Sequence, residues 1–127
     1  IGDMPHAWIS SDFIRSMLDM FAYQRFEDDA LVLGAGLSEA WLSNGGSAVK
    51  GLRTPYGTLD FAIHADTRRM TVTIDGTARP PGGFVLPWPL AGRPGTATVD
   101  GKSSLWRNRA LLIAPTGRPI MIEMKRP

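Results

Sequence analysis

The sequence predicts a mainly β fold, an antiparallel β-sandwich preceded by one amphipathic N-terminal α-helix. Short apolar runs recur about every eight to twelve residues through most of the chain, and Gly and Pro separate them. Helical spacing of apolar residues is confined to the N-terminal region. Strands do not alternate with helices, as a parallel sheet would require. A chain of 127 residues is long enough for one core and short for two.

An amphipathic helix is expected from Ser11 to Tyr23. Apolar residues in this range recur at intervals of three or four, which places them along one face of a helix. They are Phe13, Ile14, Met17, Leu18, Met20 and Phe21. Ser11 can cap the first turn, and Asp12 adds the negative charge that a helix N-terminus favours. The stripe is wider than a solvent-facing helix needs, so we expect it to pack against a substantial apolar surface.

Short strands are expected in the rest of the chain. They are Leu31–Leu33, Ala48–Leu52, Thr58–His64, Met70–Asp75, Phe84–Trp88, Ala97–Val99, Ala110–Ala114 and Pro119–Met124. The clearest alternation of apolar and polar residues lies in Thr58–His64 and in Met70–Asp75. Because only a few residues around Asp66-Thr67-Arg68 separate these two strands, we expect them to pair antiparallel as a hairpin.

The composition argues against several classes of function. The chain has 14 Lys and Arg against 12 Asp and Glu, and the basic residues are scattered, so no nucleic-acid partner is expected. It has no cysteine, which removes disulfides, thiolate zinc sites and thiol catalysis. No apolar run approaches the ~20 residues of a membrane-spanning helix, so no membrane contact is expected. No cofactor is predicted, and the compartment stays open.

Two segments carry a resemblance to a known family. His6-Ala7-Trp8 opens the expected helix, and Thr54-Pro55-Tyr56-Gly57 forms a turn before an alternating strand. In this order they resemble the last helix of the (α/α)6 catalytic barrel, and the β-sandwich behind it, in inverting α-L-rhamnosidase-like glycoside hydrolases. The resemblance covers residues 2–76. It implies that residues 1–27 are the terminal helix of an upstream catalytic barrel and that residues 28–127 form a β-sandwich domain.

The resemblance also implies a role for the domain. In those enzymes the general acid and the general base lie in the barrel, upstream of the segment present here, so no residue of this chain is expected to be catalytic. We expect a non-catalytic C-terminal domain of a bacterial-type hydrolase, which packs against the catalytic barrel of the same parent chain and stabilises it. A periplasmic or secreted parent is one option for its location.

Four residues are candidates for contact with carbohydrate. His6 and Trp8 could hydrogen-bond and stack on a sugar at the mouth of the barrel, and Trp41 and Trp88, together with Trp106, could form a stacking platform. Ordinary packing is the alternative for each of them. Two other functions therefore stay open, a carbohydrate-binding module that uses surface tryptophans and an oligomerisation domain. A homo-oligomer would form through the exposed face of the N-terminal helix.

Three further patterns favour structural roles. Glu27-Asp28-Asp29 has the oxygen ligands that calcium prefers but not the spacing of a calcium-binding loop, so a solvated loop is expected and no metal site. Gly34-Ala35-Gly36 lacks the third glycine of a dinucleotide-binding motif, so a turn is expected. His64 could join Asp60 or Asp66 and a serine in a hydrolase triad, but the sequence has no nucleophile-elbow motif, so an exposed His64 is expected. The serines considered are Ser38, Ser43 and Ser47.

Overall fold

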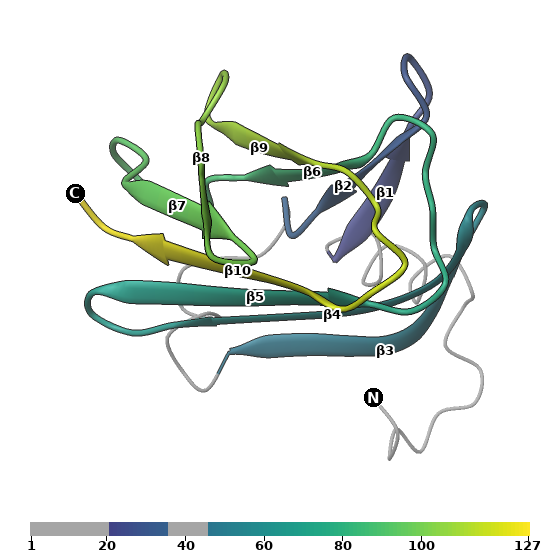
Figure 1. The fold of residues 1–127 in the computed structure, drawn as a ribbon, viewed down its shortest axis with the longest axis horizontal. Helices are drawn as coiled ribbons and strands as arrows, with labels where there is room; N and C mark the ends of the chain where they lie inside the picture. Colours follow the sequence, from purple (N-terminus) through teal and green to yellow (C-terminus); the bar gives the residue numbers. More distant parts are fainter. Residues whose placement is uncertain (1–20, 36–45) are drawn as a thin grey trace, which may run out of the picture.

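The computed structural model describes residues 21–35 and 46–127, which form β-strands in two sheets. The strands are β1 (Ala22–Arg25), β2 (Ala30–Leu33), β3 (Ser47–Thr54), β4 (Gly57–Ala65), β5 (Arg69–Asp75), β6 (Phe84–Pro87), β7 (Thr96–Val99), β8 (Lys102–Ser104), β9 (Ala110–Ile113) and β10 (Ile120–Lys125). These two ranges contain no helix, so none that could cross a membrane. Figure 1 shows one sheet above the other. The prediction of a mainly β, sandwich-like fold is confirmed.

The two sheets differ in size and in strand direction. The four-stranded sheet has the order β1-β2-β6-β9, and the six-stranded sheet has the order β3-β4-β5-β10-β7-β8. Neighbouring strands are antiparallel except β2 and β6, which pair in parallel with Leu31 opposite Phe84 and Val32 opposite Val85. The expectation of a purely antiparallel sandwich is wrong at this pair. The reason is that β3, β4 and β5 join the other sheet before the chain returns beside β2.

The order of strands confirms one prediction and corrects another. β4 and β5 form the predicted antiparallel hairpin. Ala22 and Tyr23, the last two residues of the predicted helix, belong to strand β1. The predicted helix is therefore wrong at its C-terminal end. These residues instead pair with β2, and the N–H of Gly34 donates to the carbonyl of Phe21 at 2.7 Å. The rest of the predicted helix, residues 11–20, lies outside the described residues, and β1 begins before the domain boundary expected at residue 28.

The core lies between the sheets and is built from alternate residues of the strands. In β4 and β10 the inward residues are Leu59, Phe61, Ile63, Ile120, Ile122 and Met124, and all of them are buried. Met121, between two of these residues, points outward and is exposed. Burial of one such Leu, Ile or Phe side chain contributes roughly 1.5–3 kcal/mol, so the alternation determines which face of each strand points inward.

The four-stranded sheet carries a second apolar cluster on its outer face. The strand registers place Tyr23, Val32, Val85 and Leu112 in one row across β1, β2, β6 and β9, and we call these four residues the outer apolar row. Val32 and Val85 are only 3% and 6% exposed, and Ala30 beside them is fully buried. Tyr23 and Leu112, at the ends of the row, are 43% and 67% exposed. The centre of the row is therefore buried although it faces away from the core.

One edge of the six-stranded sheet is interrupted by a bulge in β3. The register shifts between Val49 and Leu52, and Gly51 within this bulge has a φ of 66°, a conformation that favours glycine. The N–H of Gly51 donates to Oδ1 of Asp60 at 2.7 Å. A bulged edge is a poor template for a further strand, so β3 ends the sheet and resists edge-to-edge association.

A polar network centred on Tyr56 joins the two sheets at one end of the molecule. The Tyr56 hydroxyl donates to Oδ1 of Asp29 at 3.1 Å and accepts from Nε2 of Gln24 at 2.9 Å. Its backbone carbonyl accepts from the N–H of Arg79 at 3.1 Å. Desolvation and the neighbouring Asp29 raise the pKa of Tyr56, so the hydroxyl keeps the proton that it donates. The turn between β3 and β4 is thereby tied to the hairpin of β1 and β2.

Replacing Ile122 with Ala should lower the free energy of unfolding by about 2–5 kcal/mol, because it leaves a cavity between the sheets. Met121→Ala, one position along the same strand, should change it by less than about 0.5 kcal/mol, because that side chain is exposed. Urea denaturation followed by circular dichroism measures both. Equal losses for the two variants would contradict the assignment of inward and outward faces to β10.

Candidate functional site

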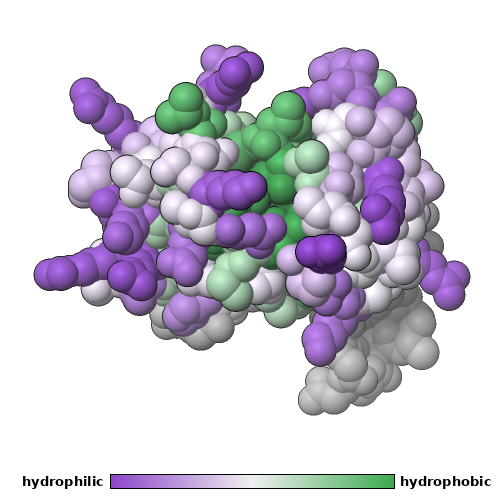
Figure 2. Space-filling view, viewed as in Figure 1, coloured by the Kyte–Doolittle hydropathy of each residue, from purple (hydrophilic) through white to green (hydrophobic). Residues whose placement is uncertain are grey.

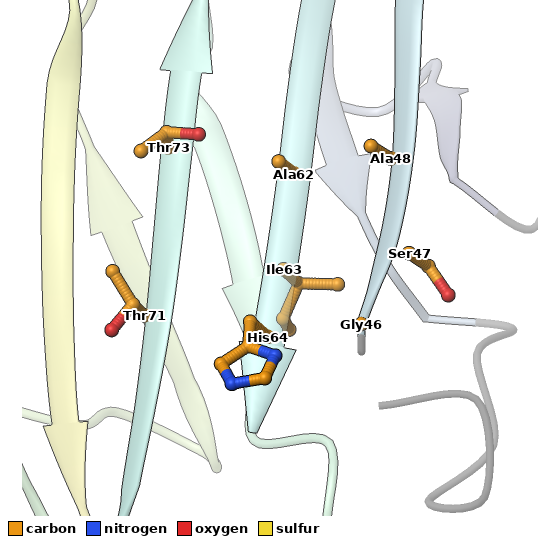
Figure 3. Close-up of a pocket in the computed structure, with 8 residues that line it drawn as sticks. All are labelled: Gly46, Ser47, Ala48, Ala62, Ile63, His64, Thr71 and Thr73. Carbon is orange, nitrogen blue, oxygen red and sulfur yellow. The ribbon is translucent and has the colours of Figure 1, made fainter. Parts of the chain in front are cut away.

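A shallow depression on the outer face of the six-stranded sheet is the candidate site within the described residues. It has a volume of about 260 Å³. Figure 3 shows it spanning β3, β4 and β5, where small side chains form the floor and His64 stands beside them. The lining residues are Gly46, Ser47, Ala48, Ala62, Ile63, His64, Thr71 and Thr73. The surface dips because alanine and threonine on three neighbouring strands leave room above the sheet.

His64 is the titratable side chain of this depression, and its surroundings decide what the site can do. Its cross-strand partner on β5 is Thr71, and Thr71 lies opposite Glu123 on β10. Two interstrand spacings of about 4.8 Å put the backbones of His64 and Glu123 about 10 Å apart, so the register does not pair the imidazole with that carboxylate. The depression offers hydrogen-bonding groups to a polar ligand, but its lining supplies no acid and base in contact.

The serines considered for a hydrolase triad do not meet His64. Ser47 lies on β3 opposite Ile63, and Figure 3 shows its hydroxyl directed away from the imidazole. Ser38 and Ser43 lie outside the described residues. The prediction that His64 is exposed on the polar face of its strand is confirmed.

Two carboxylates face each other on the same sheet, a pair that the sequence analysis missed. Asp60 and Asp75 are cross-strand partners on β4 and β5, and the Cβ atoms of such partners lie about 5 Å apart. Asp60 accepts from Gly51 in the bulge, and Asp75 accepts from the N–H of Gly76 at 2.8 Å. Each carboxylate therefore accepts a hydrogen bond from a nearby backbone N–H group. The alternation of apolar and polar residues in β4 and β5 predicts their hairpin, and the register of that hairpin could have revealed that Asp60 and Asp75 lie opposite each other.

The two described tryptophans form a packed pair. Trp88 is 5% exposed and meets Trp106 edge to face, with ring centroids 5.2 Å apart and planes at 87°. The indole N–H groups of both are buried and have no hydrogen-bond acceptor among the described residues. Because a sugar stacks on an accessible ring face, and Trp88 lies in the core, this indole presents no such face.

The other candidates for carbohydrate contact are His6, Trp8 and Trp41. All three lie outside the described residues.

The acidic run Glu27-Asp28-Asp29 forms the tip of the hairpin between β1 and β2. Nη2 and Nε of Arg25 donate to the two carboxylate oxygens of Asp28 at 2.6 and 2.9 Å, and this pairing lowers the pKa of Asp28. Asp29 accepts from Tyr56. In the ranges that the structure describes, no three His, Asp or Glu side chains gather as a metal site would require. The carboxylates of Asp28 and Asp29 are thus engaged in holding the hairpin.

Comparisons with protein-family models, with curated proteins and with solved structures find no match to this chain.

Asp66 gives the hairpin between β4 and β5 a measurable dependence on pH. Its Oδ1 accepts from the N–H groups of Arg68 and Arg69 at 2.8 and 2.7 Å, and these bonds lower the pKa of Asp66. A carboxyl whose pKa is lower in the folded state stabilises the fold above its unfolded pKa of about 3.9, and this stabilisation is lost as the pH falls through the folded pKa.

Asp66→Asn, which keeps an acceptor oxygen but removes the charge, should therefore reduce the free energy of unfolding at neutral pH. The difference from the unchanged protein should shrink as the solution is made more acidic than about pH 4. Asp66→Ala, which removes both acceptor and charge, should keep part of its penalty in acid. Urea titrations over a pH series measure all three proteins, and a difference for Asp66→Asn that does not vary with pH would contradict this account.

Proposed function

We propose that this chain is the non-catalytic β-sandwich domain of a glycoside hydrolase similar to the α-L-rhamnosidases, and that it packs against the catalytic barrel of its parent chain and stabilises it. The proposal takes its family from the resemblance carried by His6-Ala7-Trp8 and by the turn Thr54-Pro55-Tyr56-Gly57. A bacterial parent that acts on carbohydrate, in the periplasm or outside the cell, is part of the proposal.

The observation that carries the proposal is the structural role of that turn. Tyr56 joins the six-stranded sheet to the hairpin of β1 and β2 through Asp29 and Gln24. Gly57 has a φ of 128°, and a Cβ atom added there would lie 2.8 Å from the carbonyl of Thr77. A segment fixed between the sheets in this way serves the architecture of the domain, which supports a stabilising function over a ligand-binding one.

The placement of the carboxylates also supports a domain without catalysis of its own. Glycoside hydrolysis requires two carboxyl groups that flank the bond to be broken. Here Asp60, Asp66 and Asp75 accept from nearby backbone N–H groups, and Asp28 pairs with Arg25. These groups are used locally, as expected if the acid and the base of the parent lie in another domain.

The full-length parent provides the test. Ile122→Ala should make the parent lose activity faster on heating, while kcat/KM measured at a temperature where it stays folded should be unchanged, because the domain supplies stability and no reacting group. Met121→Ala is the matched control, and it should leave both quantities unchanged. A fall in kcat/KM with unchanged thermal stability for Ile122→Ala would contradict the proposal.

The alternative function is a carbohydrate-binding module, and a titration with sugars distinguishes the two. Titration of the chain with rhamnose, galacturonan and xylan oligosaccharides should leave its tryptophan fluorescence without a saturable change, since Trp88 is buried. Saturable quenching would favour the binding module instead. Loss of that quenching in Trp8→Phe or Trp41→Phe, tested one at a time, would then identify the residue that stacks on the sugar.

A further inference from the structure

Two exposed Asp-Gly pairs lie at the ends of strands, and the fold holds their carboxylates in different ways. They are Asp75-Gly76, where β5 ends, and Asp100-Gly101, between β7 and β8. Their sequence contexts are matched, because a β-branched residue precedes each pair, Ile74 in one case and Val99 in the other. A difference in their chemistry would therefore come from the fold.

The Asp75 carboxylate lies against the backbone nitrogen of the next residue. Oδ1 of Asp75 accepts from the N–H of Gly76 at 2.8 Å. Since a carboxyl carbon is bonded to its oxygen at about 1.2 Å, Cγ of Asp75 lies within about 4 Å of the same nitrogen. Gly76 has no side chain to screen this nitrogen, and both residues are exposed to water. A nitrogen and a carboxyl carbon that could bond are thus held side by side.

The Asp100 carboxylate is held by another strand instead. Its Oδ1 accepts from the N–H of Met121 on β10 at 2.9 Å, and the N–H of Asp100 donates to the carbonyl of Met121 at 2.8 Å. Bringing this carboxyl onto the nitrogen of Gly101 would break the side-chain bond to β10. Asp100-Gly101 is therefore an internal control with the same two residue types.

The fold requires the glycine at the end of β5. Gly76 has a φ of 100°, and a Cβ atom added there would lie 2.5 Å from the carbonyl oxygen of Thr58. The chain leaves β5 along a side of the molecule that is mainly hydrophilic in Figure 2, whereas hydrophobic side chains gather where β6 and β9 lie in Figure 1. An Asp-Gly pair is thus kept at a place that water reaches.

We propose that Asp75-Gly76 is a site of spontaneous isoaspartate formation, and that the fold favours this reaction at Asp75 over Asp100. The nitrogen of Gly76 attacks Cγ of the protonated Asp75 carboxyl, and the new N–C bond closes a five-membered succinimide ring. The N–H proton and the carboxyl OH leave together as one water. A second water then opens the ring. Its attack at Cγ restores aspartate, and its attack at the main-chain carbonyl of Asp75 gives isoaspartate, whose main chain runs through Cβ and Cγ.

Isoaspartate at this position would loosen the contact between the end of β5 and the beginning of β4. It adds one carbon atom to the main chain, two residues before Thr77. The N–H of Thr58 donates to Oγ1 of Thr77 at 2.9 Å, and the carbonyl of Thr58 accepts from the N–H of Ala78 at 2.8 Å. A longer main chain displaces these partners, so the modified domain should unfold more easily. The inference concerns the chain alone and does not rest on the proposed function.

An endoproteinase that cleaves before aspartate, but not before isoaspartate, reads both sites in one digest. The unmodified chain gives peptides 66–74, 75–99 and 100–127. Isoaspartate at residue 75 gives peptide 66–99 instead, and isoaspartate at residue 100 gives peptide 75–127. The chain is kept warm in buffer for several weeks, either folded or in urea, and mass spectrometry follows the two longer peptides over time.

In the folded chain, isoaspartate should accumulate about tenfold faster at Asp75 than at Asp100, because only Asp75 is held against the attacking nitrogen. In urea the two rates should become similar, since the sequence contexts are matched. Equal rates in the folded chain, or a faster reaction at Asp100, would overturn the proposal. So would the absence of peptide 66–99 from the folded chain. A difference that persists unchanged in urea would also overturn it, because the sequence and not the fold would then be its cause.

Asp75→Glu tests the consequence for stability. The variant keeps the charge, but its carboxyl lies one bond further along the side chain and would have to close a less favourable six-membered ring. Urea denaturation of the aged unchanged chain should show a fraction that unfolds at lower urea, equal to the fraction recovered as peptide 66–99. Aged Asp75→Glu should unfold like its fresh sample. An isomerised fraction that unfolds at the same urea concentration as the fresh chain would contradict the loosening.

Discussion

The burial of strand β2 on both of its faces is the constraint that organises the four-stranded sheet. Leu31 and Leu33 point into the core between the sheets, while Ala30 and Val32 point to the outer face, and all four are buried. A strand with no polar side must also pair along both of its edges, since unpaired N–H and C=O groups are costly to bury. β1 and β6 supply that pairing.

The parts of the fold that the sequence predicted are those with a strong local pattern. Leu59, Phe61 and Ile63 alternate with polar residues, so β4 and its hairpin partner could be recognised without knowledge of the rest. β1 could not, because Ala-Tyr-Gln-Arg has no alternation of its own and directly follows a helical period. Its state depends on β2, whose apolar residues need a partner. The polar strand β8, Lys102–Ser104, was missed for the same reason, since only its pairing with β7 makes it a strand.

The candidate site was harder to predict than the fold, because the relevant distances are set by pairing between strands. The sequence left two roles open for Trp88, a stacking platform and ordinary packing, because its burial and its contact with Trp106 arise only from the tertiary structure. The opposition of Asp60 and Asp75 follows from the register of one hairpin, which a turn of one more or one fewer residue would have changed. The exposure of His64, by contrast, followed from the alternation of a single strand and could be predicted.

The parallel pairing of β2 with β6 has a consequence for how the chain is made. When β1 and β2 emerge during synthesis, the strand that will pair with the free edge of β2 has not yet been synthesised, because β3, β4 and β5 come first. Until β6 arrives, an apolar strand is present with one edge unpaired, and such edges are prone to mispairing with other chains. Contacts between residues distant in sequence also form slowly. The hairpin of β4 and β5, which is local, can fold during this interval and offer its apolar face to β2 before the four-stranded sheet is complete.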